Sequence, residues 1–148
     1  KPISRELILS AHAMPGSESL IKWCYENNIP LALVTSSSSE SFQIKSDPHS
    51  WMSLFSTKVL GDDKSLLKGK PAPDPYLLAA KKLNVDAKEC WAVEDSISGR
   101  SSALKAGCCV FLLKEKNDES LINKLTNTNN NLKEIIQLKE IKQILESY

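Results

Sequence analysis

The chain has 148 residues, of which 41% are hydrophobic and 25% charged, and its formal net charge at pH 7 is +1. This length suffices for one domain with a buried core, and the balanced charge provides no basic surface for nucleic acid or a membrane. No apolar run approaches the roughly 20 residues of a membrane span, and the four cysteines lack the spacing of a disulfide framework. We therefore expect a cytoplasmic protein with no nucleic-acid or membrane partner.

The N-terminal part of the sequence predicts two helices and then a strand. We expect a helix over residues 1–13, with Leu7 and Ile8 as its apolar contacts. The spacing of apolar residues predicts an amphipathic helix over 17–27. Asn28 and Pro30 mark the end of the second helix. The apolar run over 31–34 is typical of a parallel strand buried on both faces, and it ends at Thr35.

The serine run over 36–39 has the composition of a flexible linker, but Ser37 and Glu40 have the spacing of a capping box. We therefore expect a helix to begin here, with Thr35 and the following amides at the carboxyl edge of the sheet. The free amides and positive dipole end of a helix N-terminus suit a phosphate group. Thr35 and Ser36 are accordingly candidate phosphate ligands.

A weaker strand is predicted over 57–60, followed by a loop over 61–69. Lys70 precedes Pro71, which disfavours a helical conformation at the lysine. Asp74 is a candidate N-cap with Pro75 at the first helical position. Lys70 therefore lies on a loop that enters a helix, where its ammonium group could neutralise phosphate oxygens.

The run from Trp91 to Ser96 predicts a strand that delivers two adjacent carboxylates, Glu94 and Asp95, to its carboxyl end. Ligands of open α/β sheets bind at that edge, and a pair of carboxylates favours a hard cation such as Mg²⁺. The alternative is an acidic turn that only caps the next helix, which Gly107 would end.

The remaining elements complete an alternating pattern. A strand is expected over 109–113, a helix from Asp118 through Leu125, a polar loop over 126–131, and then an amphipathic helix or a short strand followed by a helix. The predicted fold is α/β, a Rossmann-like parallel sheet with helices on both faces.

Three segments carry a family resemblance: the strand ending at Thr35, then Lys70 with Pro71-Ala72-Pro73-Asp74, then Glu94-Asp95-Ser96. In this order they resemble motifs two to four of the haloacid dehalogenase-like hydrolases, in the branch of β-phosphoglucomutase and sugar-phosphate phosphatases. The resemblance extends over residues 14–115. It implies Mg²⁺-dependent phosphoryl transfer through an aspartyl-phosphate, on a small phosphorylated metabolite.

The resemblance also implies roles for single residues. Asp95 would bind Mg²⁺ directly, and Glu94 would support the metal through water. Lys70 would bridge the phosphate and carboxylate charges, Thr35 would hydrogen-bond a phosphate oxygen with Ser36 beside it, and Thr35 and Lys70 are the expected catalytic residues. We expect the side chains of Thr35, Lys70, Glu94 and Asp95 to converge at one edge.

One family feature is absent from the sequence: the Asp-x-Asp motif, whose first Asp is the nucleophile, on the first strand of the core. Met14-Pro15-Gly16 resembles the point at which the family's chain returns from its cap domain. We therefore interpret residues 1–13 as the remnant of a cap or hinge helix and 14–148 as an incomplete core domain without its first strand.

Two consequences are expected. The isolated chain should be inactive, and the strands ending at Thr35 and Asp95 should either close on each other or leave a gap that another chain fills by self-association. Two alternatives stay open: a non-catalytic phosphate- or metal-binding remnant, and an unrelated α/β metal-binding module such as a receiver-like domain. The sequence does not distinguish phosphatase from mutase, nor name the substrate.

Overall fold

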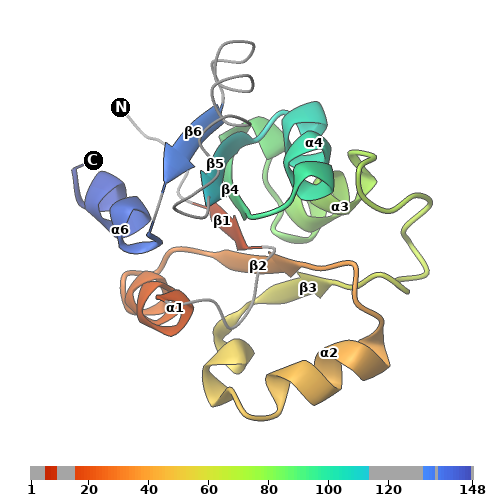
Figure 1. Cartoon of the computed structure of the whole chain (residues 1–148), viewed down its shortest axis with the longest axis horizontal. Helices are drawn as coiled ribbons and strands as arrows, with labels where there is room; N and C mark the ends of the chain where they lie inside the picture. The colour runs from red at the N-terminus through yellow and green to blue at the C-terminus, as the bar shows by residue number, and fades with distance from the viewer. Residues whose placement is uncertain (1–5, 10–15, 114–131, 136, 148) are drawn as a thin grey trace.

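A computed structural model describes residues 6–9, 16–113, 132–135 and 137–147. These residues form a six-stranded parallel sheet with the order β3-β2-β1-β4-β5-β6 (Figure 1). The strands are β1 Glu6–Leu9, β2 Leu31–Val34, β3 Thr57–Val59, β4 Cys90–Glu94, β5 Cys109–Leu113 and β6 Leu132–Ile135.

Helices cover both faces of the sheet. On one face α1 contacts α6, and on the other α3 packs against α4 (Figure 1). The helices are α1 Ser17–Glu26, α2 Ser39–Ser46, α3 Asp74–Lys82, α4 Ile97–Ala106 and α6 Lys139–Glu146, with short 3₁₀ helices η1 Ser50–Leu54 and η2 Ala87–Glu89.

Each face of the sheet has its own hydrophobic core, because successive residues of a strand point to opposite faces. In β2, Leu31 and Leu33 join the core beneath α1 and α6, whereas Ala32 and Val34 join the core beneath α3 and α4. All four side chains are buried. This accounts for the continuous apolar run, and it confirms the predicted α/β fold with helices on both faces.

The strands expected over 31–34, 57–60, 90–94 and 109–113 are present within one residue of their predicted bounds. The last part of the chain takes the second of its two predicted forms, a short strand and then a helix, β6 followed by α6. The helix predicted from Asp118 through Leu125 and the polar loop over 126–131 lie outside the described residues.

The predicted helix over 1–13 is wrong at Glu6–Leu9, which form β1; the rest of that range lies outside the described residues. The register places Leu9 beside Leu33 of β2 and Val93 of β4. A short apolar run does not separate helix from buried strand by periodicity. Here the backbone groups of two flanking parallel strands require partners, and β1 supplies them.

The expected gap in the sheet is therefore absent. β2 and β4 do not close on each other, and no second chain is needed between them, because β1 pairs in parallel with both. The prediction of self-association across this gap loses its structural basis. β1 occupies the place at which the resemblance puts the nucleophile strand.

The helix ends differ from prediction by one residue in two places. Ser38, not Ser37, caps α2, and its hydroxyl accepts a hydrogen bond from the Ser41 amide at 3.2 Å. Asp74 is the first residue of α3 and not its cap. The positive φ angles of Asn28 (57°) and Gly107 (100°) fit the left-handed conformation that ends α1 and α4.

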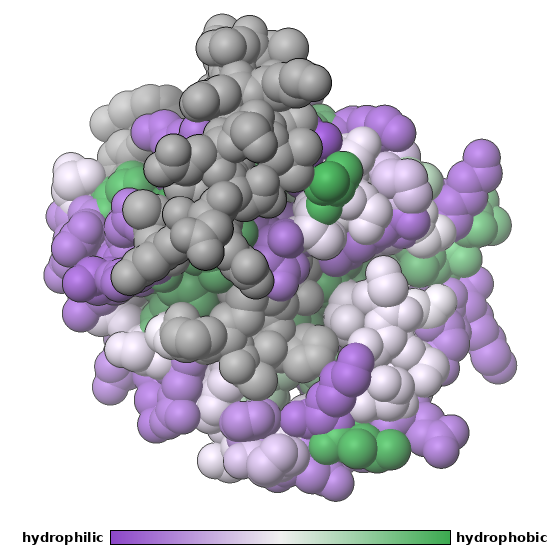
Figure 2. Space-filling view, in the orientation of Figure 1, coloured by the Kyte–Doolittle hydropathy of each residue, from purple (hydrophilic) through white to green (hydrophobic). Residues whose placement is uncertain are grey.

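In the part of the chain that the structure describes, no helix has the length and apolarity needed to cross a bilayer. The described surface in Figure 2 is largely polar, with apolar side chains in small separate patches. The large exposed apolar residues come from five different segments: Tyr25, Ile44, Leu67, Leu77 and Ile97.

Candidate active site

The carboxyl ends of β2 and β4 meet at Lys70. Its ammonium group lies 2.8 Å from Glu94 Oε2 and donates to the Val34 carbonyl at 3.3 Å. Val34 and Glu94 each follow the residue that pairs with Leu9. Lys70 therefore connects the two strands that flank β1, at the edge where α/β sheets bind ligands.

Lys70 reaches this position from the loop between β3 and α3, as predicted, and its peptide bond to Pro71 is cis. The side chains of the pair are 9% exposed for Lys70 and 1% exposed for Glu94. Solvent screens the attraction within such a buried ion pair only weakly. Removing one partner would leave the other as an uncompensated buried charge. The pair therefore holds the edge of the site in a fixed arrangement.

Glu94 is also bound by groups from α3 and α4. The Tyr76 hydroxyl donates to Oε2, and the Ser96 hydroxyl donates to Oε1 at 3.3 Å. Gly99 lies directly against the carboxylate, and a Cβ built at this glycine would collide with it. Both oxygens of Glu94 are thus engaged by the protein.

Thr35 follows β2 and is buried. Its amide donates to the Val59 carbonyl at 3.0 Å, and its Oγ1 accepts from the Ser37 amide at 3.2 Å. The Gly61 amide donates to the Ser37 carbonyl at 2.7 Å, where a Cβ on the glycine would strike the Ser36 carbonyl. The loops after β2 and β3 are therefore held together. Ser36 is exposed, and its amide donates to no acceptor among the described residues.

The N-terminus of α2 differs from the expectation of free amides. The Ser39 amide donates to both carboxylate oxygens of Asp62, at 3.1 and 3.0 Å, and the Ser39 hydroxyl donates to Oδ1 at 2.9 Å. These hydrogen bonds, the amide first, lower the pKa of Asp62. A carboxylate already lies at the positive end of this helix, which restricts the predicted phosphate site to the residues before α2.

Asp95 follows Glu94 at the end of β4, and its side chain is exposed. Among the described residues, no cluster of three or more His, Cys, Asp or Glu side chains could hold a metal. The two carboxylates at the end of β4 differ: that of Glu94 is buried and hydrogen-bonded, whereas that of Asp95 is open to solvent. The structure brings Lys70 and Glu94 into direct contact. Thr35 directly follows β2 and Asp95 directly follows β4, the two strands that Lys70 connects.

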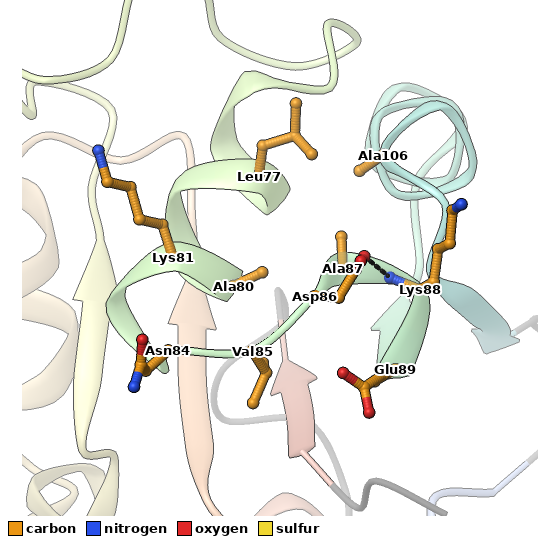
Figure 3. A pocket seen from close by; sticks show the side chains of 10 residues that line it. All are labelled: Leu77, Ala80, Lys81, Asn84, Val85, Asp86, Ala87, Lys88, Glu89 and Ala106. Atoms are coloured by element: carbon orange, nitrogen blue, oxygen red, sulfur yellow. Dashed lines mark hydrogen bonds between the residues drawn. The ribbon is translucent and has the colours of Figure 1, made fainter.

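A hollow on the described surface lies elsewhere. It is bounded by α3, η2 and the end of α4, with Leu77, Lys81 and Ala106 among its lining residues (Figure 3). η2 precedes β4, whereas Glu94 ends that strand. None of the predicted site residues lines this hollow, so it is not part of the candidate site.

The cysteines do not contribute reactive thiols. All four are free, and Cys24 and Cys108 are fully buried. Burial raises the pKa of each of these two thiols to about 12. A thiol held in its protonated form is a poor nucleophile and metal ligand.

The sequence did not predict Tyr76, the hydrogen bond of Ser96 to Glu94, or the chemical reason for Gly99. Tyr76 contacts Glu94 across 18 positions of sequence, a separation that no local pattern reports. Ser96 directly follows the carboxylate pair and caps α4 through the Gly99 amide at 3.0 Å. Gly99 makes room in α4 for the carboxylate of Glu94.

A family model described as haloacid dehalogenase-like hydrolase matches residues 3–107. The chain belongs to this family. A "Probable pseudouridine-5'-phosphatase" from Drosophila melanogaster is 38% identical over 113 residues, which are 74% of this chain and 49% of the relative. Hexitol phosphatase A from Escherichia coli K12 is 32% identical over 128 residues, 86% of this chain and 58% of the relative.

Solved structures agree with this assignment. A "putative beta-phosphoglucomutase" from Thermotoga maritima superimposes with a TM-score of 0.77 at 26% identity, over 90% of this chain and 60% of that protein. These relatives confirm the branch of β-phosphoglucomutase and sugar-phosphate phosphatases, and they exclude an unrelated module of the receiver type. The chain spans about half the length of curated phosphatases that it matches.

Proposed function

We propose that this chain carries the phosphate- and metal-binding part of a phosphohydrolase, a phosphatase or phosphomutase that acts on a small phosphorylated metabolite. The observation that carries the proposal is the buried ion pair of Lys70 with Glu94, which joins the ends of β2 and β4. The relatives named above as phosphatases support the same reaction class. The proposed core domain comprises residues 14–148 together with β1, because Glu6–Leu9 pair with β2 and β4 of the core sheet; the rest of 1–13 remains the proposed cap or hinge segment.

Lys70 supplies the positive charge of the proposed phosphate site. An ammonium group has three donors, and two of them are directed at Glu94 and Val34. The third remains for a phosphate oxygen. Thr35 and the Ser36 amide, on the neighbouring loop, complete the set of donors that would hold the phosphate.

The carboxylates fit Mg²⁺, which is usually held by one or two carboxylates together with substrate phosphate and water. Asp95 would bind the ion directly, because its carboxylate is exposed, and Glu94 would support it through water. The ion would neutralise charge that develops on the transferred phosphoryl group.

The cytoplasmic location expected from the sequence remains a prediction.

The nucleophile of the proposed aspartyl-phosphate mechanism is not supplied by this sequence. Ser10, Ala11 and His12 follow β1 and carry no carboxylate, and no Asp-x-Asp occurs in the chain. We therefore expect the 148-residue chain to bind phosphate without hydrolysing phosphate monoesters. This same observation favours the second candidate function, a non-catalytic phosphate- or metal-binding protein.

The test is a titration of the 148-residue chain with inorganic phosphate and Mg²⁺, in which binding is measured by calorimetry and NMR. Because removing Lys70 alone would strand a buried charge, the variant combines Lys70→Met with Glu94→Gln. We expect phosphate affinity to fall by about tenfold or more, as for loss of a charge-assisted hydrogen bond. Lys68→Met, an exposed lysine on the same loop, is the control and should bind phosphate normally.

Asp95→Asn should weaken Mg²⁺ binding and leave phosphate binding in the absence of metal unchanged. Equal phosphate affinity in wild type and the double variant would refute the proposed site. Hydrolysis of p-nitrophenyl phosphate by the isolated chain, abolished by Asp95→Asn, would refute the assignment of the missing nucleophile. A longer protein with an Asp-x-Asp strand that binds both ligands without turnover would favour the non-catalytic function.

A further inference from the structure

Tyr76 is the third residue of α3, and its side chain is fully buried. It belongs to the apolar core that contains Val34, Ala92 and Ala103. A phenylalanine would fill the same apolar space. A buried hydroxyl is costly unless it has a hydrogen-bond partner, and the partner of Tyr76 is the carboxylate of Glu94.

Tyr76 and Lys70 share one oxygen atom. The Tyr76 hydroxyl and the Lys70 ammonium both donate to Glu94 Oε2. The same ammonium lies 5.7 Å from the centre of the Tyr76 ring, within the range of a cation–π contact. Tyr76 therefore acts on both members of the ion pair, on one through its hydroxyl and on the other through its ring.

The remaining contacts of Glu94 make this arrangement rigid. Ser96 donates to the other oxygen at 3.3 Å, and Gly99 allows α4 to approach the carboxylate closely. The carboxylate has thus no space on the α4 side into which it could turn. The positions of Oε2 and of the Lys70 ammonium are fixed by groups from α3, α4 and β4.

We propose that Tyr76 is a positioning residue of the phosphate site, which holds Glu94 and thereby leaves the Lys70 ammonium free to bind phosphate. By donating to Oε2, the Tyr76 hydroxyl compensates part of the negative charge on the oxygen that Lys70 also binds. The attraction between the Lys70 ammonium and Glu94 is consequently weaker, so the ammonium attracts a phosphate more strongly. Its third N–H group keeps one direction. This inference rests on the proposed function, because it assigns Tyr76 to the same site.

The experiment measures the affinity of the 148-residue chain for inorganic phosphate, with Mg²⁺ present, in wild type, Tyr76→Phe and Tyr25→Phe. Tyr76→Phe removes the hydroxyl and keeps the ring. Tyr25→Phe makes the same chemical change at an exposed position on α1. We expect the dissociation constant to rise about fivefold in Tyr76→Phe, the size of one ordinary hydrogen bond, because Tyr76 acts on the ligand indirectly, and to stay unchanged in Tyr25→Phe.

A second comparison separates positioning from a general structural effect. In a Glu94→Gln background, Lys70 remains but the charge that Tyr76 stabilises is gone. Tyr76→Phe should then change phosphate affinity by less than about twofold, because coupled residues show non-additive effects. An equal loss of affinity in both backgrounds would overturn the inference, since it would show that Tyr76 acts on the fold and not through Glu94.

A measurement on the wild type covers the case in which Tyr76→Phe does not fold. The Tyr76 hydroxyl proton, buried and bound to a carboxylate, should be visible by NMR, and its resonance should move as phosphate is added. A resonance that stays in place while phosphate binds overturns the inference. If wild type binds no phosphate, the proposed function fails and this inference with it; if wild type and Tyr76→Phe bind equally well, the inference alone fails.

Discussion

The carboxylate of Glu94 is bonded on one oxygen by Lys70 and Tyr76 and on the other by Ser96. A charge in this position is tolerated because both of its oxygens accept hydrogen bonds. The fit is sterically tight on the side of α4, where Gly99 lies against the group. The carboxylate of Glu94 therefore leaves no room for a side chain at position 99.

Gly99→Ala should destabilise the protein. In an ordinary helix this change stabilises by up to about 1 kcal/mol, but the added Cβ would collide with a carboxylate that cannot move away, and such overpacking costs about 1–3 kcal/mol. We expect the midpoint of urea unfolding to fall and phosphate affinity to fall with it. Gly69→Ala is the control, because a Cβ there meets nothing within 4 Å. A more stable Gly99→Ala variant would contradict this account.

At the scale of residues, the sequence predicted the members of the site that belong to short motifs. Lys70 with Pro71 and Glu94 with Asp95 each lie within a few residues of a recognisable helix start or strand end. Tyr76 could not be predicted, because nothing in a buried aromatic at the start of a helix distinguishes a core residue from one that also bonds a carboxylate. Its role depends on a contact between α3 and β4.

The N-terminus of α2 is stabilised by a residue from another loop. Asp62, after β3, accepts hydrogen bonds from the amide and the hydroxyl of Ser39. Adjacent Asp63 binds Lys82 at the end of α3 at 3.0 Å. The loop between β3 and α3 is thus attached to two helices before it reaches Lys70, which helps to place the lysine.

This attachment should depend on pH. Because the hydrogen bonds of Ser39 hold the pKa of Asp62 below its ordinary value of 3.8, its contribution is complete above that value and is lost as the pH falls through the lower folded pKa. The protection factors of the amides in the first turn of α2, which correct for intrinsic exchange, should therefore fall in acid. Asp62→Asn should show faster exchange at neutral pH and a weaker acid dependence, whereas Asp47→Asn, after the last turn of α2, should match wild type. Unchanged exchange in Asp62→Asn would refute this role.

At the scale of elements, strands buried on both faces were predictable as continuous apolar runs, and β2, β4 and β5 follow this pattern. β1 was not, because four residues that include Leu7 and Ile8 fit a helix and a buried strand equally well. Its identity is decided by its two neighbours in the sheet, which the sequence does not reveal. The one-residue error at the cap of α2 has a simpler cause, since four consecutive serines offer several equivalent caps.

For the molecule as a whole, β1 has a central position. It pairs with β2 and β4, and these strands carry the two sides of the site, Val34 with Thr35 and Glu94 with Asp95. Within the described residues, β1 and the Lys70 ion pair each connect β2 with β4. The stability of the fold and the geometry of the phosphate site should therefore be lost together when β1 is disrupted.

Ile8→Pro tests this coupling. Ile8 lies opposite Ala32 on one side and Ala92 on the other, so its amide faces a neighbouring strand whichever way it points. Proline removes that donor, and each buried acceptor left unsatisfied costs about 1–3 kcal/mol, a large fraction of a total stability of about 5–15 kcal/mol.

We expect the urea midpoint of Ile8→Pro to fall sharply and phosphate binding to be lost in the same preparation. Ile8→Val keeps the amide and favours a strand, so it should retain both properties. If Ile8→Pro has the same urea midpoint as wild type, β1 does not stabilise the centre of the sheet. If it is destabilised but still binds phosphate with wild-type affinity, the two sides of the site are held by Lys70 alone, and the ion pair rather than the strand determines the geometry of the edge.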